Sequence, residues 1–97
     1  MFIKKKIKIK NSQGLHARPA SAFVKIANKF ESDIVVKKGS ESVNGKSIMG
    51  LMTLAANKGS TIEIEASGPD ANKAMEALAQ FLITDSEDTA HTQGPAV

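Results

Sequence analysis

The sequence predicts an α+β fold: an open-faced two-layer sandwich in which a four-stranded antiparallel sheet carries three helices on one face. The chain has 97 residues, 41% of them hydrophobic, which is enough for one domain with one core. Apolar residues follow the period of a strand in some segments and that of a helix in others. The resulting order, βαββαβα, consists of split βαβ units, which form antiparallel sheets with their helices on one side.

The first predicted strand covers residues 2–10. Ile3, Ile7 and Ile9 fall on one face of this extended segment, and lysines alternate with them on the other. Lys5 interrupts the apolar face, so the beginning of the strand is expected to fray. The simplest interpretation of the lysines is a face of the sheet that contacts water.

The first predicted helix starts at residues 16–18, after a turn-forming run at 11–14. Pro19 suits its first turn, where a missing N–H breaks no hydrogen bond. The spacing of the apolar residues builds one stripe along this helix. The stripe consists of Ala20, Phe23, Val24, Ala27 and Phe30.

Two strands and a short helix are predicted in the middle of the chain. The β-branched residues 34–36 favour a strand, and residues 41–43 form a shorter and weaker one. A helix over residues 47–55 follows. Ser47 suits its N-cap, and the turn at 57–59 ends it. The residues expected on its core face are Leu51, Leu54 and Ala55.

The last strand covers residues 61–66, with Ile62 and Ile64 facing inward. The last helix begins at residues 68–70, with Pro69 at its first position. Its buried stripe is expected to contain Ala71, Ala74, Met75, Leu78, Phe81 and Leu82.

The chain divides into a domain over residues 1–83 and an acidic tail over 84–97, which is expected to be disordered. The tail has three acidic residues and no Lys or Arg, so the domain carries 13 basic and 7 acidic side chains. A basic domain favours acidic or phosphorylated partners. Nucleic acid is the alternative, but the chain has no Trp or Tyr and three of its four Phe fall on core stripes. Stacking on bases requires exposed aromatic rings.

Several classes of protein are disfavoured by composition. Cysteine is absent, which excludes disulfides and thiolate metal sites. No apolar run approaches the roughly 18 residues that would span a membrane, and lysines interrupt the segment where a signal peptide would have its apolar region. The sequence therefore predicts a cytoplasmic protein with no metal, no cofactor and no insertion into the membrane.

The histidine at position 16 lies where a turn enters the first helix. The first N–H groups of a helix lack partners and its dipole is positive there, so this end attracts phosphate and disfavours a protonated imidazole. A neutral imidazole has a lone pair that can attack phosphorus. Arg18 is near enough to donate hydrogen bonds to a bound phosphate. From chemistry alone, an ordinary surface or capping histidine is the alternative.

Residues 14–20 read Gly-Leu-His-Ala-Arg-Pro-Ala, and all seven resemble the active-site signature of the HPr family. The resemblance implies phosphorylation of His16 on Nδ1, with Arg18 stabilising the phosphate. It also implies a phosphocarrier between Enzyme I and the IIA domains of sugar transporters, not a free-standing catalyst. The positions that would support the phosphate loop are Gly14, Ala17 and Pro19. The second histidine, His91, lies in the tail and is assigned no role.

A second segment, Lys-Ser-Ile-Met-Gly at residues 46–50, resembles the regulatory serine segment of HPr proteins. The resemblance implies ATP-dependent phosphorylation of Ser47 by an HPr kinase/phosphorylase, which would inhibit transfer at the histidine. Capping the short helix would by itself explain this serine. A helix N-terminus tolerates phosphate, so we expect inhibition through repulsion from an acidic partner and not through unfolding.

An apolar patch is expected beside Ser47, because a short helix has only one face for the core. Methionine adapts to varied surfaces, and an exposed apolar patch marks a contact site; completing the core is the alternative role. The expected partner contacts are Leu15, Lys25, Lys46, Ile48, Met49 and Met52.

Two other functions remain as alternatives. A nitrogen-related phosphotransferase paralogue would keep the same histidine site and differ only in its partners. A small hydrolase of the acylphosphatase kind has a similar length and strand order, but the phosphate-binding loop it needs is not evident.

Overall fold

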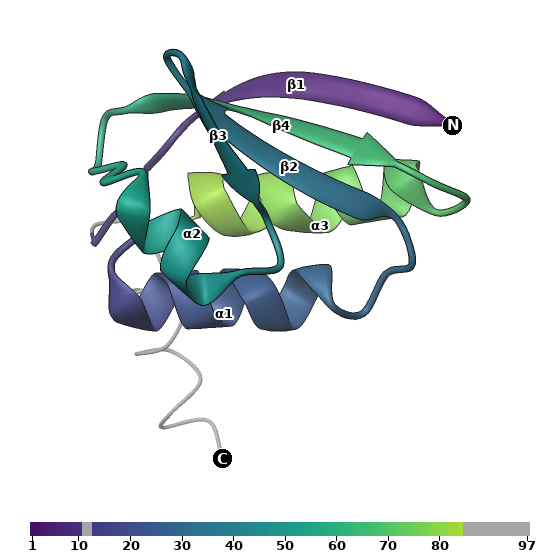
Figure 1. Cartoon of the computed structure of the whole chain (residues 1–97), viewed down its shortest axis with the longest axis horizontal. Helices are drawn as coiled ribbons and strands as arrows, with labels where there is room; N and C mark the ends of the chain where they lie inside the picture. Colours follow the sequence, from purple (N-terminus) through teal and green to yellow (C-terminus); the bar gives the residue numbers. More distant parts are fainter. Residues whose placement is uncertain (11–12, 85–97) are drawn as a thin grey trace.

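The computed structural model describes residues 1–10 and 13–84 (Figure 1). The order of elements is β1 (Phe2–Lys8), α1 (Ala17–Ala27), β2 (Asp33–Lys38), β3 (Glu41–Asn44), α2 (Ile48–Thr53), β4 (Thr61–Ser67) and α3 (Ala71–Ile83). All three helices lie on one face of a four-stranded sheet (Figure 1). The predicted α+β sandwich with the order βαββαβα is therefore confirmed.

The sheet has the strand order β1-β4-β2-β3, and every neighbouring pair is antiparallel. The first and last strands of the chain thus lie side by side, with Ile7 opposite Ile62. On the next strand pair Val36 lies opposite Ile64. These apolar pairs share the face that the helices cover, as the alternation in the sequence indicates.

The start of β1 is intact, so the expected fraying at Lys5 is wrong. Lys5 lies opposite Ile64, and the ladder continues to Phe2 opposite Ser67. The lysine is tolerated because β1 is an edge strand, where its side chain is exposed. Charged side chains at a sheet edge also discourage pairing with other chains.

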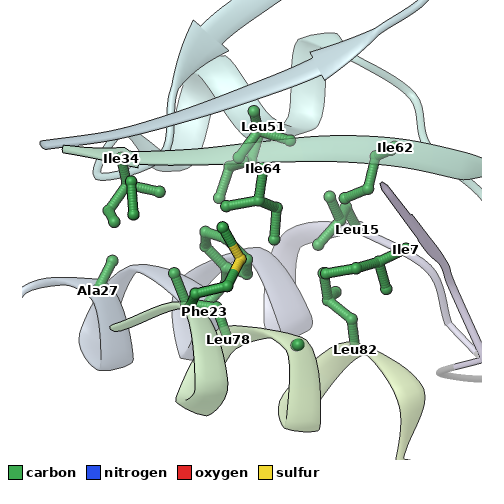
Figure 2. Packing of buried hydrophobic residues seen from close by; sticks show 14 of the residues in the cluster. Ile7, Leu15, Phe23, Ala27, Ile34, Leu51, Ile62, Ile64, Leu78 and Leu82 are labelled. Atoms are coloured by element: carbon green, nitrogen blue, oxygen red, sulfur yellow. The ribbon is translucent and has the colours of Figure 1, made fainter. Parts of the chain in front are cut away.

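The core lies between the sheet and helices α1 and α3 (Figure 2). Phe23 and Leu78 extend from the two helices toward Ile64 on the sheet. The Phe23 ring is fully buried and meets Phe81 edge-on, with ring centroids 6.4 Å apart. The predicted stripes of both helices are buried, except that Phe30 and Phe81 are only partly covered.

Several boundaries differ from the predictions; β1, for example, ends at Lys8 and not at residue 10. Helix α2 is shorter than expected, and Ala55 lies beyond it, exposed, at a φ of +53°. The last helix begins at Ala71, so Pro69 precedes it and does not occupy its first position. Asp70 stands at the N-cap without capping the helix through its side chain. Its carboxylate accepts hydrogen bonds from the loop between α1 and β2 instead.

The Asp70 carboxylate joins α3 to the loop between α1 and β2. It accepts hydrogen bonds from the backbone N–H of Glu31 (2.9 Å) and of Ser32 (3.0 Å), and from the Ser32 hydroxyl. Ser32 is the one fully buried polar residue in the described part of the chain. The hydroxyl of Ser32, followed by the Glu31 amide, holds the pKa of Asp70 below its usual value of 3.8.

The lowered pKa of Asp70 predicts a pH-dependent stability. A carboxyl that is more acidic in the folded state stabilises it above pH 3.8, and this contribution is lost as the pH falls through the lowered pKa. Asp70→Asn should therefore lower the urea midpoint at pH 7, and its difference from the wild type should narrow at acidic pH. The exposed Asp33 provides the control, because Asp33→Asn should change the midpoint little. A pH-independent difference for Asp70→Asn would contradict this role.

Candidate functional site

The predicted phosphoryl acceptor, His16, occupies the N-cap of α1. Its backbone is extended (φ −77°, ψ −173°), and its carbonyl accepts from the N–H of Ala20 at 2.8 Å, which closes the first helical turn. The side chain makes no capping hydrogen bond and is exposed. The imidazole is therefore presented to solvent at the positive end of an eleven-residue helix.

The first turn of α1 offers donors to an anion. The backbone N–H groups of Ala17 and Arg18 donate no hydrogen bond to residues 13–84, and Pro19 has no N–H. The turn contains no acidic residue, and the Arg18 side chain is exposed. Two backbone amides lie at the helix end that carries the imidazole, and an exposed arginine belongs to the same turn, which is the setting expected for a phosphate.

The segment before the histidine is held against a turn that lies about forty residues later in the chain. Gly14 has a φ of +65°, and a Cβ there would lie 2.6 Å from the carbonyl oxygen of Ala56 and 2.8 Å from Cα of Asn57. The N–H of Leu15 donates to the same Ala56 oxygen at 2.8 Å. Gly14 is therefore required both for its conformation and for the close approach of the two backbones.

The prediction that Leu15 contacts a partner is wrong. Its side chain is 2% exposed and lies in the core between Ile62 and Ile7 (Figure 2). The sequence places it next to His16, which is exposed, but the two successive side chains have opposite surroundings. Leu15 instead anchors the residue that precedes His16.

The other supporting positions have different surroundings. Pro19 is buried beneath the first turn of α1, whereas Ala17 is exposed beside the histidine. A buried proline with a fixed φ limits the movement of the turn that carries His16 and Arg18. The small side chain of Ala17 leaves the amides at the helix end open.

Ser47 caps α2 as predicted. Its backbone is extended, and its Oγ accepts from the N–H of Gly50 at 3.0 Å. A Cβ at Gly50 would lie 3.2 Å from Val43, so the glycine lets α2 pack closely on β3. The serine is half-buried, and its hydroxyl already serves the helix.

The apolar patch expected on α2 is present on the surface. Ile48 is 40% exposed, Met49 79% and Met52 45%, whereas Leu51 is fully buried. The three exposed residues are called the α2 patch below. The chain runs from the end of α2 directly to Ala56, whose carbonyl oxygen accepts from the N–H of Leu15. The patch is thereby connected to the segment that leads to His16, residues 9–16, here called the histidine loop.

The two lysines predicted as rim charges lie in different settings. Lys25 is exposed in the last turn of α1. Lys46 is half-buried, and its ammonium donates to the carbonyl oxygen of Phe30 at 2.8 Å. Lys46 thus also links the loop after α1 to the turn before α2, a role that the sequence did not indicate.

Neither a metal centre nor a membrane-spanning helix is found where the structure describes the chain. Residues 1–10 and 13–84 contain no group of three or more side chains suited to hold a metal ion. The helices of this part are too short and too polar to cross a bilayer. The predicted acidic tail, with His91, lies outside the described residues apart from Thr84.

Comparisons with known proteins show which proteins this chain is similar to. A family model described as the PTS HPr component phosphorylation site matches residues 3–84. The HPr-like protein Crh of Halalkalibacterium halodurans is 49% identical over 81 residues, which cover 84% of this chain and 96% of that protein. Phosphocarrier protein HPr of Neisseria meningitidis is also 49% identical over 81 residues, covering 84% and 91%. The crystal structure of HPr from Bacillus anthracis superposes with a TM-score of 0.81 at 46% identity, covering 84% and 96%.

Proposed function

This chain belongs to the HPr family of the phosphotransferase system, and from that premise we propose that His16 is its phosphoryl acceptor. Proteins of this family are phosphocarriers in a phosphotransferase relay and not free catalysts. The observation that carries the proposal is the exposed imidazole at the N-cap of α1, beside two backbone amides that donate no hydrogen bond within the described part of the chain. The donor is phospho-Enzyme I, and the recipients are IIA domains of sugar transporters in the cytoplasm.

The transfer requires positioning and charge stabilisation more than covalent help from the protein. The lone pair of a ring nitrogen of His16 attacks phosphorus as the bond from phosphorus to the donor's histidine breaks, and the donor nitrogen recovers its electron pair. The phosphoryl group brings about −1.5 to −2 charges. In this proposal the guanidinium of Arg18 and the amides of Ala17 and Arg18 hold its oxygens. The reverse sequence of bond changes delivers the group to a IIA domain.

The α2 patch is the proposed contact surface for these partners. Its apolar side chains are exposed next to the turn that holds the histidine loop, and the surrounding charge of the domain is basic. A brief contact needs a small interface with an apolar centre and a polar rim. Lys25 and Lys46 would supply part of that rim and favour acidic partner surfaces.

Regulation at Ser47 by an HPr kinase/phosphorylase is the second part of the proposal. The N-terminus of α2 has the Gly50 amide directed at the serine oxygen, so a phosphate there would find a donor already in place. The α2 patch begins at the next residue. A phosphate on Ser47 would therefore place negative charge in the contact surface without unfolding the helix.

A regulatory carrier is the second candidate function. A relative named HPr-like protein Crh matches this chain at the same identity as a phosphocarrier HPr, and one solved Crh structure is titled catabolite repression HPr. Such a paralogue, or one of the nitrogen-related branch, would share the fold and differ in its partners. Transfer from phosphorylated His16 to sugar IIA domains distinguishes the carrier from both.

A labelling experiment with two separate incubations tests both phosphorylation sites. The protein is incubated with Enzyme I and labelled phosphoenolpyruvate, and separately with HPr kinase and labelled ATP. Label at His16 should be lost in acid, whereas label at Ser47 should survive it. Absence of acid-labile label would contradict the carrier function, and absence of acid-stable label would contradict regulation at Ser47.

Ser47→Asp should slow phosphoryl transfer to His16 by at least about tenfold, because repulsion from an acidic partner costs about 1.4 kcal/mol for each factor of ten. The free energy of unfolding should stay within about 0.5 kcal/mol, since aspartate is also a good N-cap. Ser47→Asn is the matched control: it has the same shape and capping ability but no charge, and should transfer at the normal rate. Equal rates for the two variants would contradict the charge mechanism.

A further inference from the structure

The turn between α2 and β4, residues 54–60, holds both ends of the segment that leads to His16. At one end, the N–H of Ile9 donates to Ser60 and the N–H of Gly59 donates to Ile9, both at 2.8 Å. At the other end, the N–H of Leu15 donates to the carbonyl oxygen of Ala56 at 2.8 Å. The histidine loop is thus fixed at both ends to one turn, here called the template turn. Any shift of this turn is transmitted to the backbone directly before His16.

The template turn contains a residue in an unfavourable conformation. Ala55 has a φ of +53°, and it is the only non-glycine residue with a positive φ in the described part of the chain. In this left-handed region the Cβ of an L-residue crowds the following carbonyl oxygen. Such a conformation persists only where neighbouring contacts hold it.

One of those contacts is made by Lys38. Its ammonium donates to the carbonyl oxygen of Ala55 at 3.2 Å. Lys38 is the last residue of β2 and lies opposite Glu41 in the ladder with β3, so its backbone is part of the sheet. The bonded carbonyl belongs to the peptide group between Ala55 and Ala56, and the next carbonyl along is the one that binds Leu15.

We propose that Lys38 is a positioning residue for phosphoryl transfer at His16: its ammonium fixes the Ala55–Ala56 peptide and through it the Ala56 oxygen that holds Leu15. The inference rests on the proposed function of His16. Lys38 does not touch the phosphoryl group. It acts through the template turn, and its effect is on the geometry of the loop.

The contact between Lys38 and Ala55 should affect the rate of transfer and the free energy of folding to different extents. The Lys38 hydrogen bond is exposed to water, and an exposed interaction of a lysine adds little to the free energy of folding. Phosphoryl transfer depends steeply on the placement of the reacting atoms, and small displacements far from the chemistry reduce rates strongly. Loss of the contact should therefore change the transfer rate much more than the stability.

The test compares Lys38→Met with Lys37→Met and Lys38→Arg in the full-length chain. Lys37 is the adjacent residue of β2, but its ammonium pairs with Glu65 at 2.8 Å on the open face of the sheet. Lys38→Met should lower kcat for transfer from phospho-Enzyme I to His16 by about tenfold, with KM within about twofold of the wild type. Lys37→Met should transfer normally, and Lys38→Arg should restore most of the rate because it keeps a donor.

Amide hydrogen exchange at Leu15 provides a second readout that needs no phosphate. The Leu15 N–H should exchange about tenfold faster in Lys38→Met than in Lys37→Met, because its acceptor on Ala56 is less well held. Unchanged exchange at Leu15 would overturn the inference, as would a normal kcat in Lys38→Met. A rise in KM alone would also overturn it, since that result identifies Lys38 as a partner contact. If the wild type accepts no phosphate on His16, the proposed function fails instead, and the exchange at Leu15 still decides whether Lys38 holds the template turn.

Discussion

Replacing His16 with alanine is expected to abolish acid-labile phosphorylation completely while leaving the fold intact. The side chain is exposed and makes no capping hydrogen bond, so its removal should change the free energy of unfolding by less than about 0.5 kcal/mol. No other histidine lies within residues 1–84, so the domain has no second imidazole to accept the phosphoryl group. The measurement is label retained from phosphoenolpyruvate through Enzyme I, together with a urea unfolding curve.

The natural control for this variant is His91→Ala, which removes the other histidine of the chain. It should accept the full amount of label. Acid-labile label on His16→Ala would refute the assignment of the site. A variant that lost label but also unfolded several kcal/mol more easily would show that His16 has a structural role that its exposed position does not indicate.

Much of the fold could be predicted because its elements are specified locally. The alternation around Ile62 and Ile64 and the helical stripe around Phe23 both report which face is buried, and the structure buries those faces. The site was also predictable in part. A histidine at a turn-to-helix junction, followed by Arg18 and Pro19, forms a compact pattern in neighbouring positions, and it resembles a family signature.

The features that could not be predicted depend on contacts between distant parts of the chain. Alanine carries no signal for a left-handed conformation, so Ala55 gave no reason to expect a positive φ. The burial of Leu15 follows from its bond to Ala56, about forty residues away, and not from its neighbours in sequence. Pro69 suited a helix start, but the carboxylate of Asp70 accepts a hydrogen bond from Ser32 in another loop, and the helix begins later.

The part that the template turn has in the site also depends on contacts between distant residues. In the sequence, residues 57–59 indicate only a turn that ends a helix. In the structure this turn accepts the Leu15 amide and contacts Gly14, so it sets the position of a histidine with which it shares no motif. A sequence pattern can identify the reacting group, but the residues that orient it are distant in the sequence and can be identified only from the folded structure.

Gly14→Ala is expected to be the most destabilising single substitution near the site, and it should also impair transfer. At a φ of +65° an alanine costs about 1–2 kcal/mol in conformation alone. Its Cβ would lie 2.6 Å from the Ala56 oxygen and 2.8 Å from Cα of Asn57, and both are backbone atoms that cannot rotate away. Overpacking of this kind adds about 1–3 kcal/mol. We therefore expect a total loss of about 2–5 kcal/mol, measured by urea unfolding.

Gly39→Ala separates the two causes of that loss. Gly39 has nearly the same φ, +62°, but no atom beyond its own two chain neighbours lies within 4 Å of a Cβ built there. It should lose only the conformational part, about 1–2 kcal/mol, and transfer phosphate at the normal rate. Gly14→Ala must in addition push the histidine loop away from the template turn, which weakens the hydrogen bond between Leu15 and Ala56. Under conditions where this variant remains folded, its rate of phosphoryl transfer should fall at least about tenfold. Equal losses of stability in the two variants would mean that separating the histidine loop from the template turn costs no free energy. The template turn would then not position His16.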